Sequence, residues 1–255
     1  MSDKLRILIV DDDRRMAKTL KDIINAKGYE AEAAYSGPEA LEKMAEGNFN
    51  CVLTDIKMPE MNGVEFYKML KKEQPDIPVV MMTAYATDKL TNEGLEEGAI
   101  ATLIKPLDIE AIFSFLSMLR KERYIVIVDD DPQFCKTLGD ILQLRGFEVS
   151  QITDPHDVVE RIGAEVQTVL LDLKLNSING LDLLREIRKK HPYLPVIMVT
   201  GYREELASVI DEVMKMNAYA CLYKPLQIEK LIEVLGKIHH QELGRVLGQP
   251  VRERI

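Results

Sequence analysis

The stretch Ile7-Leu8-Ile9-Val10-Asp11-Asp12-Asp13 returns 118 positions later as Ile125-Val126-Ile127-Val128-Asp129-Asp130-Asp131. Four apolar residues followed by three aspartates form too long a run to recur by chance, so the chain carries an internal duplication. Each apolar run predicts a strand buried on both faces of a parallel sheet, with carboxylates at its end.

Other short segments also occur twice, in the same order in both halves. Because the spacing between partners stays between 117 and 119 residues, one domain has been duplicated with small changes in its loops. We therefore expect one domain over residues 1–122, a second over 123–242 and a tail over 243–255, with no effector domain. The repeated pairs are Asp55-Ile56-Lys57-Met58 with Asp172-Leu173-Lys174-Leu175, Asn62-Gly63 with Asn179-Gly180, Val80-Met81-Met82-Thr83 with Ile197-Met198-Val199-Thr200, and Lys105-Pro106-Leu107 with Lys224-Pro225-Leu226.

Composition and charge exclude several classes of protein. The 255 residues are 46% hydrophobic and 29% charged, which is ordinary for a globular protein. No apolar stretch approaches the roughly 20 residues of a membrane span. The net charge of −9 leaves neither half with the basic surplus that duplex DNA binding requires, so no direct nucleic-acid contact is expected. Three widely spaced cysteines, Cys51, Cys135 and Cys221, predict free thiols in a reducing compartment, the cytoplasm.

Within each copy, short apolar runs alternate with segments of helical periodicity. In the first copy the strands are expected at 5–10, 30–35, 50–54, 77–82 and 100–104, and the more polar run at 30–35 is expected nearer an edge. Alternating strands and helices predict an α/β fold, (βα)5, with right-handed crossovers and helices on both faces of one parallel sheet. In such sheets, ligands bind beyond the carboxyl ends of the strands.

Polar residues of the first copy follow four of its predicted strands. Asp11 and Asp12 end the first strand, Asp55 the third, Thr83 the fourth and Lys105 the fifth. Three carboxylates at one rim repel one another unless a divalent cation or a lysine offsets their charge. Oxygen-only ligands favour a hard ion such as Mg²⁺. A lysine and a hydroxyl are suited to hold the remaining oxygens of a phosphoryl group.

With these residues in place twice and in order, each copy resembles the receiver domain of two-component response regulators. The resemblance covers nearly the whole chain and implies two flavodoxin-like, doubly wound parallel sheets with strand order 2-1-3-4-5. It implies that Asp55 and Asp172 accept a phosphoryl group from a histidine kinase or a histidine phosphotransfer protein. It also implies no enzymatic activity beyond self-catalysed phosphoryl acceptance and slow autodephosphorylation.

The resemblance further assigns roles at each rim. The Mg²⁺ ligands would be Asp11, Asp12, Asp55 and the backbone carbonyl of Lys57 in the first copy, and Asp129, Asp130, Asp172 and the backbone carbonyl of Lys174 in the second. The catalytic and switch residues would be Thr83, Lys105, Thr200 and Lys224, and both Lys-Pro peptide bonds would be cis. A receiver–receiver dimer is a further candidate partner.

Two departures from the family pattern stand out. Many receivers place Tyr or Phe three residues before the lysine, where this chain has Thr102 and Cys221, so the usual aromatic switch is in question in both copies. The second copy also has Asn176 where the first has Pro59.

Residues near each acceptor are candidates for tuning the phosphoryl lifetime. Tyr85 and Tyr202 stand two residues after the threonines, and Lys57 and Lys174 stand two after the aspartates. Their bulk could screen the phosphoryl group from water. The alternative is that both tyrosines are merely partly exposed loop aromatics.

Other functions fit the sequence less well. A flavodoxin-type FMN protein would need a Ser/Thr/Gly-rich phosphate loop where this chain has three aspartates. A phosphatase with an aspartyl nucleophile would need Asp-x-Asp on its first strand. A purely structural ion-pair network of the aspartates and the lysine would not need Thr83. Within the receiver reading, a phosphate sink or an inactive scaffold derived from a larger hybrid signalling protein is the alternative to a working signalling protein.

Overall fold

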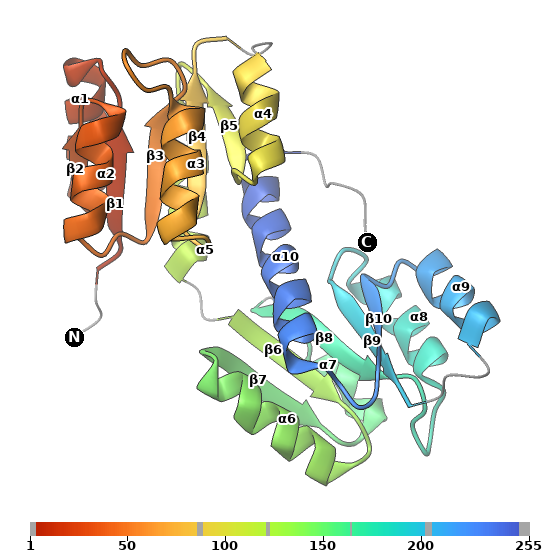
Figure 1. The fold of residues 1–255 in the computed structure, drawn as a ribbon. Helices are drawn as coiled ribbons and strands as arrows, with labels where there is room; N and C mark the ends of the chain where they lie inside the picture. The colour runs from red at the N-terminus through yellow and green to blue at the C-terminus, as the bar shows by residue number, and fades with distance from the viewer. Residues whose placement is uncertain (1–3, 86–88, 121–122, 164, 202–205, 250–255) are drawn as a thin grey trace. The chain divides into compact units, whose positions relative to one another are not determined.

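In the computed structural model, residues 4–85, 89–120, 123–163, 165–201 and 206–249 are described. The chain divides into two compact units. The first unit comprises Met1–Arg120 and His240–Val251, and the second comprises Lys121–His239 and Arg252–Ile255. Each unit contains one five-stranded, all-parallel sheet (Figure 1).

The sheet of the first unit has the strand order β2-β1-β3-β4-β5. This confirms the predicted topology, and the more polar strand β2 lies at an edge as expected. Because β3 and β4 are covered on both faces, every residue in them is buried. The strands are β1 (Arg6–Val10), β2 (Glu30–Ala34), β3 (Cys51–Asp55), β4 (Val79–Thr83) and β5 (Ala101–Ile104).

Helices cover both faces of this sheet and give it two hydrophobic cores. Leu20 of α1 and Phe115 of α5 belong to the core on one face, and Phe66 and Leu70 of α3 belong to the other, which α2 also covers. Asp13 caps α1, as its position after the first strand predicted, and accepts hydrogen bonds from two backbone N–H groups. The helices are α1 (Arg14–Ala26), α2 (Gly37–Glu46), α3 (Gly63–Glu73), α4 (Lys89–Glu97) and α5 (Ile109–Arg120).

The last turns of α10 (Ile228–Val246) belong to the first unit. Leu243 and Leu247 are buried in the same core cluster as Phe115 of α5. The Nε2 atom of His240 lies 2.9 Å from the carbonyl oxygen of Gly98. Part of the segment that was expected to be a tail therefore contributes to the core of this unit.

The second unit repeats the topology as β7-β6-β8-β9-β10. It departs from the first mainly in its second helix, which is reduced to the short α7 after a 3-10 turn, η1. The strands are β6 (Arg123–Val128), β7 (Phe147–Ile152), β8 (Val166–Asp172), β9 (Val196–Thr200) and β10 (Ala220–Tyr223). The helical segments are α6 (Pro132–Leu144), η1 (Pro155–Asp157), α7 (Val158–Arg161), α8 (Gly180–Lys190), α9 (Leu206–Lys215) and the first part of α10.

One glycine follows the first helix of each unit. Gly28 and Gly146 have φ angles of 90° and 82°, a left-handed conformation that side chains disfavour. Within the described residues, no helix is both long enough and apolar enough to cross a membrane.

Candidate functional site

In the first unit, one ammonium group bridges two buried carboxylates at the carboxyl ends of the strands. Lys105 directly follows β5, and its Nζ atom lies 2.7 Å from Oδ2 of Asp11. The same Nζ forms an ion pair with Oδ1 of Asp55. Asp11 and Asp55 are only 1% and 6% exposed, so neither can rely on water to stabilise its charge. The structure thus brings together three of the five residues expected at this rim.

Backbone N–H groups fix the other oxygen of each carboxylate. Oδ1 of Asp11 accepts a hydrogen bond from the N–H of Asp13 at 3.0 Å. Oδ2 of Asp55 accepts one from the N–H of Lys57 at 2.8 Å. The two buried carboxylates are therefore held in place, whereas Asp12 is exposed.

Thr83 ends β4 and is buried, but its hydroxyl bonds its own loop rather than a carboxylate. Its Oγ1 accepts a hydrogen bond from the N–H of Tyr85 at 3.1 Å. This hydrogen bond fixes the start of the loop after β4.

The repeated Asn-Gly pair closes the loop after β3 in the first unit and after β8 in the second. The N–H of Gly63 donates to the carbonyl of Ile56 at 2.9 Å, and a Cβ atom at Gly63 would collide with the carbonyl oxygen of Asp55. Gly180 has the same relation to the carbonyl oxygen of Asp172 in the second unit. Only glycine permits this close approach of the helix start to the end of the strand that carries Asp55 or Asp172.

The second unit builds the same bridge. Nζ of Lys224 lies 2.6 Å from Oδ2 of Asp129 and 3.2 Å from Oδ2 of Asp172. Asp130 joins them, because one carboxylate oxygen from each of the three aspartates lies within 4.8 Å of the others. Three convergent carboxylates with oxygen-only donors suit a hard divalent cation, so these residues fit Mg²⁺.

Burial and the lysines act in opposite directions on the pKa values of the Asp55 and Asp172 carboxyls. Removal from water raises the pKa of Asp55 and of Asp172, and the neighbouring lysines only partly offset this. Burial alone would lower the pKa of Lys105, but its hydrogen bonds to Asp11 and Asp55 outweigh this and raise it. Lys224 behaves in the same way, so both lysines are charged at neutral pH.

Two of the candidate lifetime residues contact each other. Nζ of Lys57 lies 4.6 Å from the centre of the Tyr85 ring, a cation–π distance, although Tyr85 itself is 61% exposed. Lys57 stands beside Asp55, because its backbone N–H donates a hydrogen bond to the Asp55 carboxylate. Tyr202, the matching candidate in the second copy, lies outside the described residues.

Phe134, in the first turn of α6, was not among the predicted site residues but lies beside the site. Nζ of Lys224 is 4.2 Å from the centre of its ring. The sequence could have indicated this from the position of Phe134, three residues after Asp131 at the start of α6.

Thr102 and Cys221, which stand where many receivers have an aromatic residue, lie in the last strand of each sheet. The hydroxyl of Thr102 in β5 is buried without a hydrogen-bond partner among the described residues, while the Thr102 carbonyl accepts from Nε2 of Gln249 at 3.4 Å. Cys221 in β10 is partly buried and is a free thiol. The peptide bonds from Lys105 to Pro106 and from Lys224 to Pro225 are both cis, as predicted.

Comparisons with known proteins agree with this geometry. The family model described as "Response regulator receiver domain" matches residues 7–117 and again residues 125–236. The chain is 31% identical over 237 residues to the response regulator receiver protein Anae109_2439 of Anaeromyxobacter sp. (strain Fw109-5), covering 92% of this chain and 96% of that protein.

Some other relatives match about one half of the chain. The transcriptional regulatory protein ZraR of Klebsiella oxytoca is 42% identical over 115 residues, which is 45% of this chain and 26% of that protein. Among solved structures, a CheY-like response regulator receiver domain protein from Methanospirillum hungatei JF-1 is 36% identical, covers 47% of this chain and 98% of its own, and has a TM-score of 0.44.

Proposed function

Because the chain belongs to the response regulator receiver family, with one receiver domain in each half, we propose that each unit accepts a phosphoryl group on one aspartate. The acceptor is Asp55 in the first unit and Asp172 in the second. The observation that carries the proposal is the lysine that bridges two buried carboxylates in each unit. We propose receiver domains over residues 1–122 and 123–242, although the end of α10 from His240 onward packs in the first unit.

The carboxylate of Asp55 attacks the phosphorus of a phosphohistidine in line. A new P–O bond forms to Asp55 as the P–N bond to the donor imidazole breaks, and the histidine leaves with the bonding electron pair. Catalysis of phosphoryl transfer is mostly positioning and charge neutralisation. The N–H of Lys57 fixes one oxygen of Asp55, and Lys105 supplies a positive charge beside the other.

A magnesium ion fits the remaining ligands at each rim. It would be held by the carboxylates and the one backbone carbonyl already assigned in each unit, and when bound it would neutralise charge on the phosphoryl oxygens. The converging carboxylates of Asp129, Asp130 and Asp172 support this assignment.

Phosphorylation would change the site through its added charge of about −1.5 to −2. Thr83 is the buried hydroxyl at the end of β4 and bonds the Tyr85 N–H. Turning that hydroxyl toward the new oxygens would release the Tyr85 N–H and move the loop after β4. Thr200 would act likewise in the second unit. A loop with two arrangements is a means of switching the binding of partner proteins.

The expected partners follow from this chemistry. The donor is a histidine kinase or a histidine phosphotransfer protein in the cytoplasm, and the modified receiver changes its association with other proteins, including another receiver. We propose no enzymatic turnover beyond self-catalysed acceptance and slow autodephosphorylation, and no direct contact with nucleic acid.

The test is labelling by acetyl [³²P]phosphate with Mg²⁺. The unmodified chain should be labelled, Asp55→Ala and Asp172→Ala should each lose part of the label, and the double variant should lose all of it. Asp22→Ala, which removes an exposed carboxylate on α1, is the control and should be labelled fully. Label that persists in the double variant would overturn the assignment of the acceptors.

Gel filtration of the labelled chain separates a switching protein from a phosphate sink. A switching protein changes its elution volume, alone or with its kinase, when both acceptors are modified. An elution volume that never shifts would favour the sink or inactive scaffold.

A further inference from the structure

The two acceptor loops differ by one hydrogen-bond donor. In the second unit the backbone N–H of Asn176 donates to Oδ2 of Asp130 at 2.9 Å. The matching position in the first unit is Pro59, and proline has no N–H. Asp12, the counterpart of Asp130, therefore cannot receive this bond.

The two units also differ in how their third carboxylate, that of Asp130 or Asp12, is placed. Asp130 is half-buried and converges with Asp129 and Asp172. Asp12 is exposed, and among the described residues it belongs to no such group of three. The second unit thus has both the loop N–H and a third carboxylate that turns inward. The first unit has neither.

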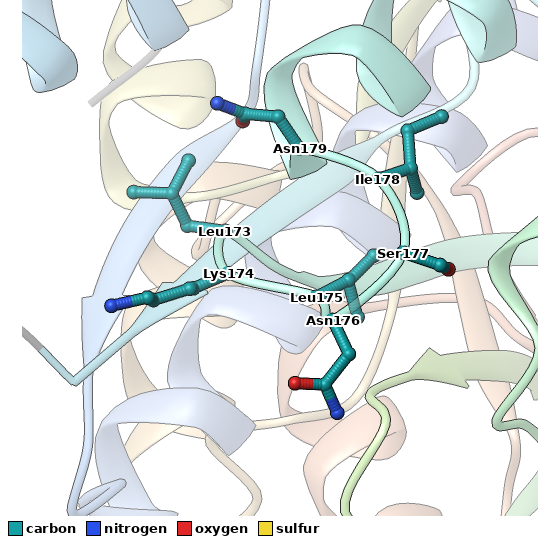
Figure 2. Close-up of a pocket in the computed structure, with 7 residues that line it drawn as sticks. All are labelled: Leu173, Lys174, Leu175, Asn176, Ser177, Ile178 and Asn179. Carbon is teal, nitrogen blue, oxygen red and sulfur yellow. The ribbon is translucent and has the colours of Figure 1, made fainter.

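The contact is made by the backbone of the loop rather than by the asparagine side chain. Residues Leu173 to Asn179 curve around an open pocket, and the side chain of Asn176 projects outward from this loop (Figure 2). An isolated antiparallel β-bridge between Lys174 and Asn179 closes this loop at its base.

We propose that Asn176 is a positioning residue whose backbone N–H orients Asp130 for Mg²⁺ before the ion arrives, so that the second unit binds Mg²⁺ more tightly than the first. The inference rests on the proposed function, because it concerns the same metal pocket. Hydrogen bonds to metal ligands orient them, and losing such a bond typically lowers metal affinity about 10- to 100-fold. Asp12 must instead be ordered when the ion binds, and this ordering lowers the affinity.

The experiment is a Mg²⁺ titration of the ¹⁵N-labelled full chain, followed by NMR. Each unit has its own reporter, because the N–H groups of Asp13 and Asp131 donate to Oδ1 of Asp11 and Asp129 respectively. We expect the Asp131 signal to reach its midpoint at a lower Mg²⁺ concentration than the Asp13 signal. Asn176→Pro should raise the Asp131 midpoint about tenfold.

Two further variants separate the N–H from the side chain. Asn176→Ala keeps the N–H and should leave the Asp131 midpoint unchanged. Pro59→Ala adds an N–H in the first unit and should lower the Asp13 midpoint, a gain that does not depend on whether proline is tolerated at 176.

The outcomes also distinguish the inference from the function on which it rests. If both units bind Mg²⁺ but Asn176→Pro and Pro59→Ala leave the midpoints unchanged, or if Asn176→Ala weakens binding as much as Asn176→Pro, the inference is overturned and the proposed function stands. If neither reporter responds to Mg²⁺, the proposed metal site fails and the inference fails with it.

Discussion

Replacing Lys105 by methionine would leave the carboxylates of Asp11 and Asp55 facing each other without their shared cation. The lysine side chain is 22% exposed, and those of Asp11 and Asp55 are 2% and 9% exposed. Two unit charges 4 Å apart interact by about 4 kcal/mol at an effective dielectric constant near 20, and removing one partner of a buried pair costs about 3–5 kcal/mol. We expect about 3 kcal/mol, the lower end, because burial has already raised the pKa of Asp55 and it can relax by taking up a proton.

Hydrogen exchange is the suitable assay because it resolves the two units. Amides of β1 report opening of the first unit and amides of β6 report opening of the second, so β6 is an internal reference. In Lys105→Met without Mg²⁺ at pH 7, exchange in β1 should become roughly a hundredfold faster, which corresponds to about 3 kcal/mol. Exchange in β6 should not change.

Lys68→Met is the matched control. Lys68 also pairs with two carboxylates, those of Glu93 at 2.6 Å and Glu97 at 3.4 Å, but all three side chains are at least a third exposed. Water and salt screen exposed pairs, which contribute little to stability, so exchange in β1 should be accelerated less than about tenfold. If Lys105→Met has no larger effect than Lys68→Met, the argument that buried carboxylates depend on the bridging lysine is refuted.

Three further substitutions test other parts of the account. Burial raises the pKa of Asp55 in the folded state, so between its ordinary and raised pKa the folded chain binds more protons than the unfolded chain. Stability therefore falls as pH rises through that range. Asp55→Asn should raise the free energy of unfolding at pH 7 but not at pH values below both pKa values, as measured by urea denaturation. Tyr85→Ala should speed loss of phosphate from the modified first unit if the ring screens the acceptor, and an unchanged single-turnover rate would mean that it is only a loop aromatic. Gly63→Ala should push the start of α3 away from the Asp55 carbonyl and slow labelling of Asp55, while labelling of Asp172 in the same chain is unaffected.

Much of the architecture could be predicted from the sequence because the signals are local and occur twice. Continuous apolar runs such as Ile7–Val10 lie in buried strands, and the polarity of residues 30–35 placed their strand at an edge. Once the strands are parallel, their carboxyl ends share one rim, so Asp11, Asp55 and Lys105 had to converge.

What escaped prediction depends on loop conformation and on contacts between distant segments. The change from Pro59 to Asn176 is visible in the sequence, but the bond from the Asn176 N–H to Asp130 depends on the path of the loop. Residues 243–255 were expected to be a tail, because nothing in their sequence indicates that Leu243 and Leu247 share a core cluster with Phe115.

The most direct measurement is to locate the modified side chains after treatment with acetyl phosphate and Mg²⁺. Borohydride reduction of an aspartyl phosphate leaves homoserine, which peptide mass spectrometry assigns to a position. The account predicts intact-mass additions of about 80 Da each, with homoserine at Asp55 and at Asp172. No added mass, or homoserine only at other aspartates, would contradict it.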